Sequence, residues 1–219
     1  GLHTSLKLLE ILRSGACQTH LIIASSEEVY GNPVTLPMTE TDIAHPISPF
    51  GVANLATERY AAVYSQLYRI STASLRFFSV YGSDQQNSPI YDLISQLIDR
   101  PETLTLQGTG TETRDFIHVR DAARAILTVL RSAPMMGEVY NIATGVPHST
   151  REVAQTIADV LRITPEIECT GQGGFGASVR WYANIEKIRQ LGFTPQTSLS
   201  DGIEEMVARY RETDRSVQT

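Results

Sequence analysis

Two short strand-like segments on either side of one long amphipathic helix constrain the fold of this sequence more than any other feature. The run His20-Leu-Ile-Ile-Ala-Ser25 is almost continuously apolar, as buried parallel strands are, and Thr72–Phe78 is interpreted as a second strand. Between them, Phe50–Tyr68 gathers its apolar residues on one helical face, and Ser48-Pro49 supplies a cap and a first-turn proline. A strand, a long helix and a second strand predict a parallel βαβ unit, and therefore a doubly wound α/β layer.

Further elements are expected on both sides of this unit. The chain begins without Met on a helix, Leu2–Leu12, which we interpret as the start of a piece cut from something longer. We interpret the glycine-rich and polar stretch Pro165–Ser178 as a loop. Helices are predicted at Pro89–Asp99, Val119–Arg131, Thr150–Leu161 and Leu199–Tyr210, and strands at Thr103–Gln107 and Glu138–Ile142.

Composition excludes several classes of function. A net charge of −6, a pI near 5.4 and the lack of adjacent basic residues argue against a nucleic-acid or anionic-membrane surface. Cys17 and Cys169 stand far apart without a CxxC pattern, and the five histidines lack ligand spacing, so no metal site is expected. No apolar run approaches the ~18 residues of a membrane span. We expect a cytoplasmic protein with two thiols buried as small hydrophobic groups.

The segment Ala24-Ser-Ser-Glu-Glu-Val-Tyr-Gly31 carries the first candidate chemistry. It follows a predicted parallel strand, and open α/β sheets bind their ligands at the carboxyl ends of such strands. One hydroxyl and two carboxylates would therefore lie at the ligand-binding edge. Taken alone, the segment also fits a solvated turn in which Ser and Glu serve turn chemistry.

Several segments together resemble the extended short-chain dehydrogenase/reductase family, in the branch of the NAD-dependent nucleotide-sugar epimerases and dehydratases. Their order and approximate spacing match that family, and they cover almost the whole chain. They are Ala24–Gly31, Ser48-Pro-Phe-Gly-Val-Ala-Asn54, Leu75-Arg-Phe-Phe-Ser-Val-Tyr-Gly82, Gly108-Thr-Gly-Thr-Glu-Thr-Arg-Asp-Phe-Ile-His-Val-Arg-Asp121, Gly137–Gly145 and Trp181–Lys187.

The resemblance implies a partial Rossmann fold that binds NAD or NADP, followed by a small α/β substrate-binding domain. Residues 1–82 would form the end of the cofactor domain and residues 83–219 the nucleotide-sugar region, with about 115–145 returning to the Rossmann layer. Family members oxidise a nucleotide-linked sugar, rearrange the ketone and reduce it again. Their glycine-rich first βα turn does not occur in this sequence.

The family's catalytic pair is altered in this sequence. The resemblance places the proton-accepting tyrosine at Phe50 and the lysine that lowers its pKa at Asn54, and neither side chain can perform those tasks. Only Ser26 of the usual three residues remains. The resemblance also assigns Ser25, Phe50, Asn54 and Phe77 to the cofactor.

Other positions bear on the substrate and the type of reaction. The resemblance assigns Arg114 to the nucleotide phosphate and Ser79 to the sugar or phosphate; alternatively, Arg114 is a surface residue paired with Asp115 or Glu112. Glu27 and Glu28 resemble the acid and base of 4,6-dehydratases. The alternative for Glu28 is a loop carboxylate in a site that has lost its chemistry.

The resemblance also implies partners. Relatives pair through the helices that correspond to Leu2–Leu12 and Phe50–Tyr68, although burial against the chain's own sheet would produce the same apolar faces. A homodimer, or a partner that supplies the missing first strands, is therefore expected. The leading hypothesis is a nucleotide-sugar epimerase/dehydratase that is impaired as this chain. The alternative is a non-catalytic nucleotide-sugar-binding or scaffolding relative that acts with a partner.

Overall fold

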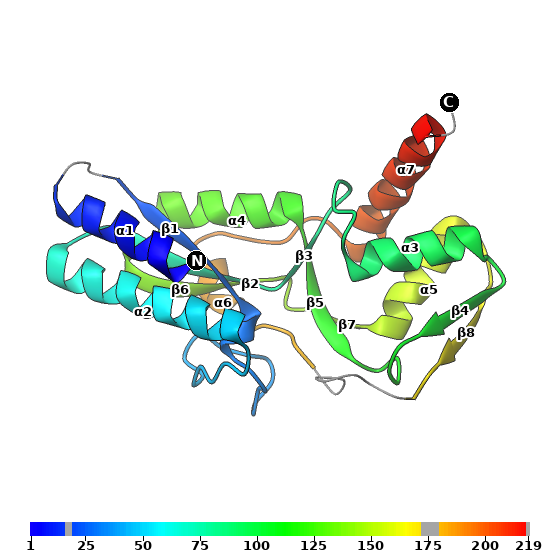
Figure 1. The fold of residues 1–219 in the computed structure, drawn as a ribbon, viewed down its shortest axis with the longest axis horizontal. Coiled ribbons are helices and arrows are strands. Elements are labelled where there is room, and N and C mark those ends of the chain that lie inside the picture. Colours follow the sequence, from blue (N-terminus) through cyan, green and yellow to red (C-terminus); the bar gives the residue numbers. More distant parts are fainter. Residues whose placement is uncertain (16–18, 172–179, 218–219) are drawn as a thin grey trace. The chain divides into compact units, whose positions relative to one another are not determined.

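The computed structural model describes residues 1–15, 19–171 and 180–217, which form two compact units (Figure 1). The first unit consists of Gly1–Phe78, Ala122–Gly145 and Trp181–Thr194, and the second of Ser79–Asp121, Val146–Arg180 and Pro195–Thr219. Cys17 and the second half of the glycine-rich stretch expected as a loop lie outside the described residues. The assignment of residues 1–82 to a cofactor and 83–219 to a substrate concerns function and stays a prediction.

The first unit is built on a three-stranded parallel sheet with the order β1-β2-β6. These strands are Leu21–Ser26, Thr72–Phe77 and Met136–Ile142, and the register pairs Ser26 with Phe77 and Phe77 with Ile142. Helix α2 (Pro49–Tyr68) packs on the sheet, and α1 (Leu2–Arg13) lies beside α2. Helix α4 (Val119–Ser132) is drawn on the other side of the strands, and the short α6 (Glu186–Arg189) packs near β6 (Figure 1). The predicted βαβ unit and doubly wound layer are confirmed.

Local sequence sets the ends of α2. Ser48 is extended and its hydroxyl accepts a hydrogen bond from the Gly51 amide at 3.0 Å, while Pro49 occupies the first turn, where its missing N–H has no cost. The helix ends at Arg69, which adopts a left-handed conformation with a φ of 57°. The cap therefore fixes where α2 begins, directly beside the end of β1.

The strands of the second unit form two small sheets. Strand β5 (Thr113–His118) pairs with β3 (Ser79–Tyr81) in parallel and with β7 (Pro147–Ser149) antiparallel, while β4 (Thr103–Leu106) and β8 (Glu166–Cys169) form a separate parallel pair. Helices α3 (Pro89–Asp99), α5 (Thr150–Leu161) and α7 (Leu199–Val217) enclose its apolar core. Ser149 and Glu152 form a capping box at the start of α5.

The prediction of a loop at Pro165–Ser178 was wrong at its beginning, where β8 lies. Glu166 and Glu168 are exposed while Ile167 and Cys169 are half-buried, which is the period-two pattern of a strand with one solvated face. The neighbouring glycines obscured this short alternation. Cys169 is half-buried rather than fully buried. Within the described ranges, no helix is long and apolar enough to cross a bilayer.

Candidate functional site

The segment after β1 forms one turn of 3-10 helix, η1 (Glu27–Val29), at the carboxyl edge of the parallel sheet. Ser26 caps this turn, because its hydroxyl accepts a hydrogen bond from the Glu28 amide at 3.2 Å. The amides of Tyr30 and Gly31 donate to the carbonyls of Glu27 and Glu28 at 3.0 and 3.3 Å. Glu27 is buried and Glu28 half-buried, so the two predicted carboxylates occupy different environments.

The Glu28 carboxylate is tied to the start of α2. The Ser48 hydroxyl donates to Glu28 Oε2 at 2.5 Å while accepting from the Gly51 amide. A β-carbon on Gly51 would lie 2.5 Å from the Glu28 carbonyl oxygen, so only glycine permits this approach of helix and turn. The partial positive charge of the α2 N-terminus favours a carboxylate at this place. The structure thus brings Ser26 and Glu28 together with Ser48, which the sequence did not single out as a site residue.

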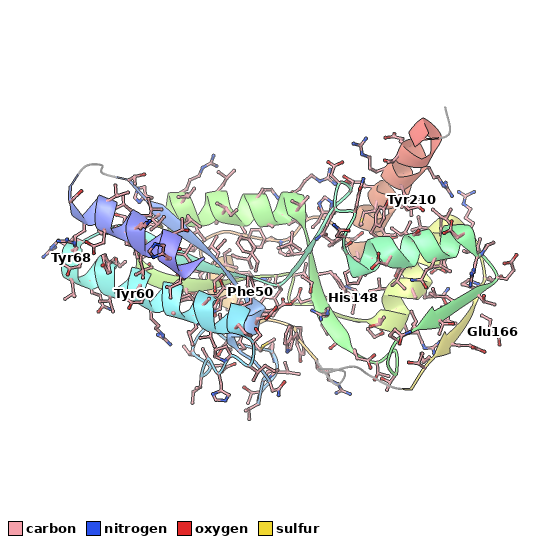
Figure 2. The ribbon with its side chains drawn as sticks, viewed as in Figure 1. Phe50, Tyr60, Tyr68, His148, Glu166 and Tyr210 are labelled. Carbon is pink, nitrogen blue, oxygen red and sulfur yellow. The ribbon has the colours of Figure 1, made fainter. Side chains whose placement is uncertain are left out.

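Phe50 and Asn54 lie four residues apart near the start of the same helix. Phe50 is 58% exposed and Asn54 is half-buried; Figure 2 shows Phe50 at the N-terminal end of α2. The phenyl ring has no exchangeable proton, and the asparagine amide is neutral. These two positions therefore offer an apolar surface and one amide, but no group that transfers a proton.

Ser25, assigned by resemblance to the cofactor, is 6% exposed and directs its hydroxyl inward. Its Oγ donates to Glu58 Oε1 at 2.5 Å. Phe77, also assigned to the cofactor, is half-buried at the end of β2. In this structure the Ser25 hydroxyl therefore serves an internal contact.

Glu58 belongs to a buried ion pair that the sequence analysis missed. Arg76 on β2 donates from Nε to Glu58 Oε1 at 3.0 Å and from Nη2 to Oε2 at 2.8 Å, and both side chains are 2% exposed. The Arg76 guanidinium lies 4.6 Å from the centre of the Tyr30 ring. A charged residue inside the predicted strand was the available signal, because a charged side chain that is buried requires a partner.

Tyr30 extends these contacts to β6. Its hydroxyl donates to Asn141 Oδ1 at 2.6 Å, and the Asn141 amide donates to the carbonyl oxygens of Met38 and Asn184. Burial raises the pKa of Tyr30 to about 12, although the nearby charge of Arg76 opposes part of that rise. Burial opposes ionisation of Arg76, but its hydrogen bonds to Glu58 and the neighbouring Tyr30 raise its pKa overall. The guanidinium therefore stays charged.

The two predicted substrate residues lie in the second unit. Ser79 is half-buried on β3 opposite Phe116, and Arg114 stands two residues earlier on β5, opposite His148. Arg114, Phe116, Glu112 and His148 help to line a cavity of about 60 Å³. Whole ligand sites enclose roughly 300–1,000 Å³, so this hollow has room for one small group, such as a phosphate. No cluster of His, Cys, Asp and Glu suited to a metal occurs in the described part of the chain.

Comparison with known proteins defines the class to which this fold and site belong. Residues 2–143 match the sequence profile described as the NAD dependent epimerase/dehydratase family. The chain is 31% identical over 220 residues to a putative UDP-glucose 4-epimerase of Methanocaldococcus jannaschii, covering 97% of this chain and 69% of that protein. It is 27% identical to the dTDP-D-glucose 4,6-dehydratase of Bos taurus, covering 87% of this chain and 55% of that protein.

Solved structures agree with these sequence matches. The UDP-glucose 4-epimerase of Thermotoga maritima with UDP-glucose superposes with a TM-score of 0.84 at 27% identity, over 95% of this chain and 68% of that one. The dTDP-glucose 4,6-dehydratase of Bacillus anthracis in complex with NAD gives a TM-score of 0.82 at 27% identity, over 96% and 67%. The chain therefore belongs to the NAD-dependent epimerase/dehydratase family and spans between about half and about two thirds of the length of these relatives.

Replacing Tyr30 with Phe tests the buried phenol. The pKa of Tyr30 in the folded state is raised from 10.0 to about 12, so the folded protein holds the phenol proton more tightly than the unfolded chain does. The stability that the neutral phenol contributes is therefore fully present below pH 10 and is lost as the pH rises toward 12. The wild type should therefore lose about 2–3 kcal/mol of unfolding free energy relative to Tyr30→Phe as the pH rises from about 10 to about 12. Urea unfolding of both proteins across this range measures the difference. A difference that does not change with pH would show that the phenol is not shifted.

Proposed function

We propose that this chain is a nucleotide-sugar-binding member of the epimerase/dehydratase family in which the usual hydride-transfer step is impaired. The proposal rests on the start of α2, where the sequence resemblance assigns Phe50 and Asn54 to the positions of the family's tyrosine and lysine. Oxidation of a sugar hydroxyl requires a group that accepts its proton while hydride leaves the carbon. Phe50 cannot accept a proton, and Asn54 has no charge with which to lower a neighbouring pKa.

The residues near the start of α2 fit a dinucleotide only in part. The Asn54 amide can donate to and accept from a ribose hydroxyl, and the rings of Phe50 and Phe77 can pack on a flat heterocycle. When bound, NAD would supply a hydride acceptor. The Ser25 hydroxyl is engaged with Glu58, and the charge and the phenol that the family's reaction uses are absent from positions 54 and 50. The residues present therefore do not fit the cofactor's usual reaction.

The remaining polar groups support binding of a substrate or a proton transfer other than the missing one. Glu28 is held by Ser48 and is half-buried, so its carboxylate can act as a base toward an acidic carbon beside a ketone. Glu27 and the Ser26 hydroxyl lie in the same turn. In the second unit, the planar guanidinium of Arg114 suits a phosphate. The family's substrates are nucleoside-diphosphate sugars, and we propose the same class here.

Introducing tyrosine at position 50 and lysine at position 54 tests directly whether hydride transfer is impaired. The double variant Phe50→Tyr with Asn54→Lys, expressed with any coding sequence that precedes Gly1, should gain about 10²–10⁴-fold in turnover of UDP-glucose or dTDP-glucose in the presence of NAD. Product formation is followed by chromatography of the nucleotide sugars. The matched control, Phe50→Leu with Asn54→Gln, should leave turnover at the wild-type level. A wild type that already turns over as fast as the double variant would refute the impairment.

The outer surface of α1 and α2 supports the further proposal that the protein acts as a homodimer. Leu8 and Ile11 on α1 are 41% and 56% exposed, and Val63 and Leu67 on α2 are 47% and 67% exposed. The two helices pack against each other, and we propose that these side chains contribute to one apolar surface. A second copy that covers this surface would bury it on both chains.

Sedimentation velocity tests this proposal. The wild type should sediment as a dimer, and the double variant Val63→Glu with Leu67→Glu as a monomer, because burying two carboxylates in an apolar interface is unfavourable. Leu127→Glu on α4, where Leu127 is 47% exposed, serves as the control and should remain dimeric. A monomeric wild type at every concentration would contradict the proposal.

A further inference from the structure

The turn that carries the candidate carboxylates is held at both of its ends by one buried ion pair. Ser25 immediately precedes the turn and donates to Glu58, while Tyr30 immediately follows it and stacks on Arg76. Glu58 and Arg76 are joined to each other by two hydrogen bonds. The residues Ser26–Val29 therefore form a short bridge whose two flanking residues contact the same pair of charges.

Stability alone does not account for this pair. Removing two ions from water costs several kcal/mol per ion, and buried ion pairs can often be replaced by apolar residues of similar volume without loss of stability. Apolar side chains would fill the same space. An apolar residue at position 58 could not accept a hydrogen bond from the Ser25 hydroxyl, and one at position 76 could not donate two coplanar hydrogen bonds to a carboxylate. The pair contributes directional hydrogen bonds, which fix where the end of β1 lies relative to α2 and β2.

The far end of the turn is also fixed. The Tyr30 ring contacts the Arg76 guanidinium, and its centre lies 6.4 Å from the centre of the Phe78 ring. The Tyr30 hydroxyl then binds Asn141 on β6. Tyr30 can therefore neither rotate nor shift without breaking a contact to each of the two neighbouring strands.

We propose that Glu58 and Arg76 are positioning residues, which touch no ligand themselves and hold the Ser26–Glu28 turn, through Ser25 and Tyr30, in the orientation that presents Glu28 at the edge of the sheet. This inference deepens the proposed function, since it concerns the turn that carries its remaining proton-transfer group. Its test uses no nucleotide, so it can fail while the proposed function stands, and the reverse also holds.

Amide hydrogen exchange of the full-length chain, followed by NMR, separates positioning from general stability. In the double variant Glu58→Leu with Arg76→Met, the amides of Glu28, Tyr30 and Gly31 should exchange at least about tenfold faster than in the wild type, because Ser25 loses its contact with Glu58 and Tyr30 its contact with Arg76. Amides in the core of α5, in the second unit, should keep their wild-type rates. The midpoint of urea unfolding, measured in parallel, should change little, because the replacements are apolar and similar in volume.

Thr57→Val is the matched control. Thr57 is buried beside Glu58 in α2, but its hydroxyl binds only the Ala53 carbonyl of its own helix. This variant should leave exchange in the turn unchanged. Wild-type exchange in the turn of the double variant would overturn the proposal. A double variant that fails to fold would also overturn it, because the pair would then be required by the whole unit rather than by the turn.

Discussion

The fork of hydrogen bonds between Arg76 and Glu58 is the contact that positions the strand ends at the carboxyl edge of the first unit. It joins the long helix to the central strand in the middle of the unit, where both side chains are 2% exposed. Through Ser25 it fixes the end of β1, and through Tyr30 and Asn141 it reaches β6. Every strand of the parallel sheet is therefore connected to one buried charge pair, and the carboxyl edge where ligands bind in such sheets is defined by it.

Phe50 and Asn54, which the sequence resemblance assigns to the family's catalytic pair, lie outside these contacts. Phe50 is 58% exposed and Asn54 is half-buried on α2, and the hydrogen bonds that anchor the turn involve neither. The start of α2 is instead held by Ser48 and by the close approach of Gly51 to Glu28. The fold of a nucleotide-sugar epimerase or dehydratase is therefore compatible with side chains at 50 and 54 that cannot carry out its proton transfer. The residues that hold the turn and the start of α2 in place are therefore different from the residues at positions 50 and 54.

Sequence patterns predicted the elements that are long enough to show several repeats of apolar residues. Helices α3 and α5 begin and end where the periodicity indicates, because caps at Ser88 and Ser149 mark their starts. The short β8 was missed because its four residues run directly into a glycine-rich stretch. The buried network was missed for another reason: its partners are 18 residues apart for Glu58 and Arg76, 33 for Ser25 and Glu58, and 111 for Tyr30 and Asn141. A charged residue in an apolar strand reveals that a partner exists, whereas only the fold reveals which residue it is.

A double-mutant cycle on the unfolding free energy tests this account most directly. Glu58→Gln and Arg76→Met each leave one buried polar or charged group without its partner, and each should cost about 3–5 kcal/mol. If the pair acts as a unit, the double variant will lose no more than the worse single variant, which gives a coupling energy of at least about 3 kcal/mol. Losses that simply add would contradict the account, because the two residues would then stabilise the protein independently.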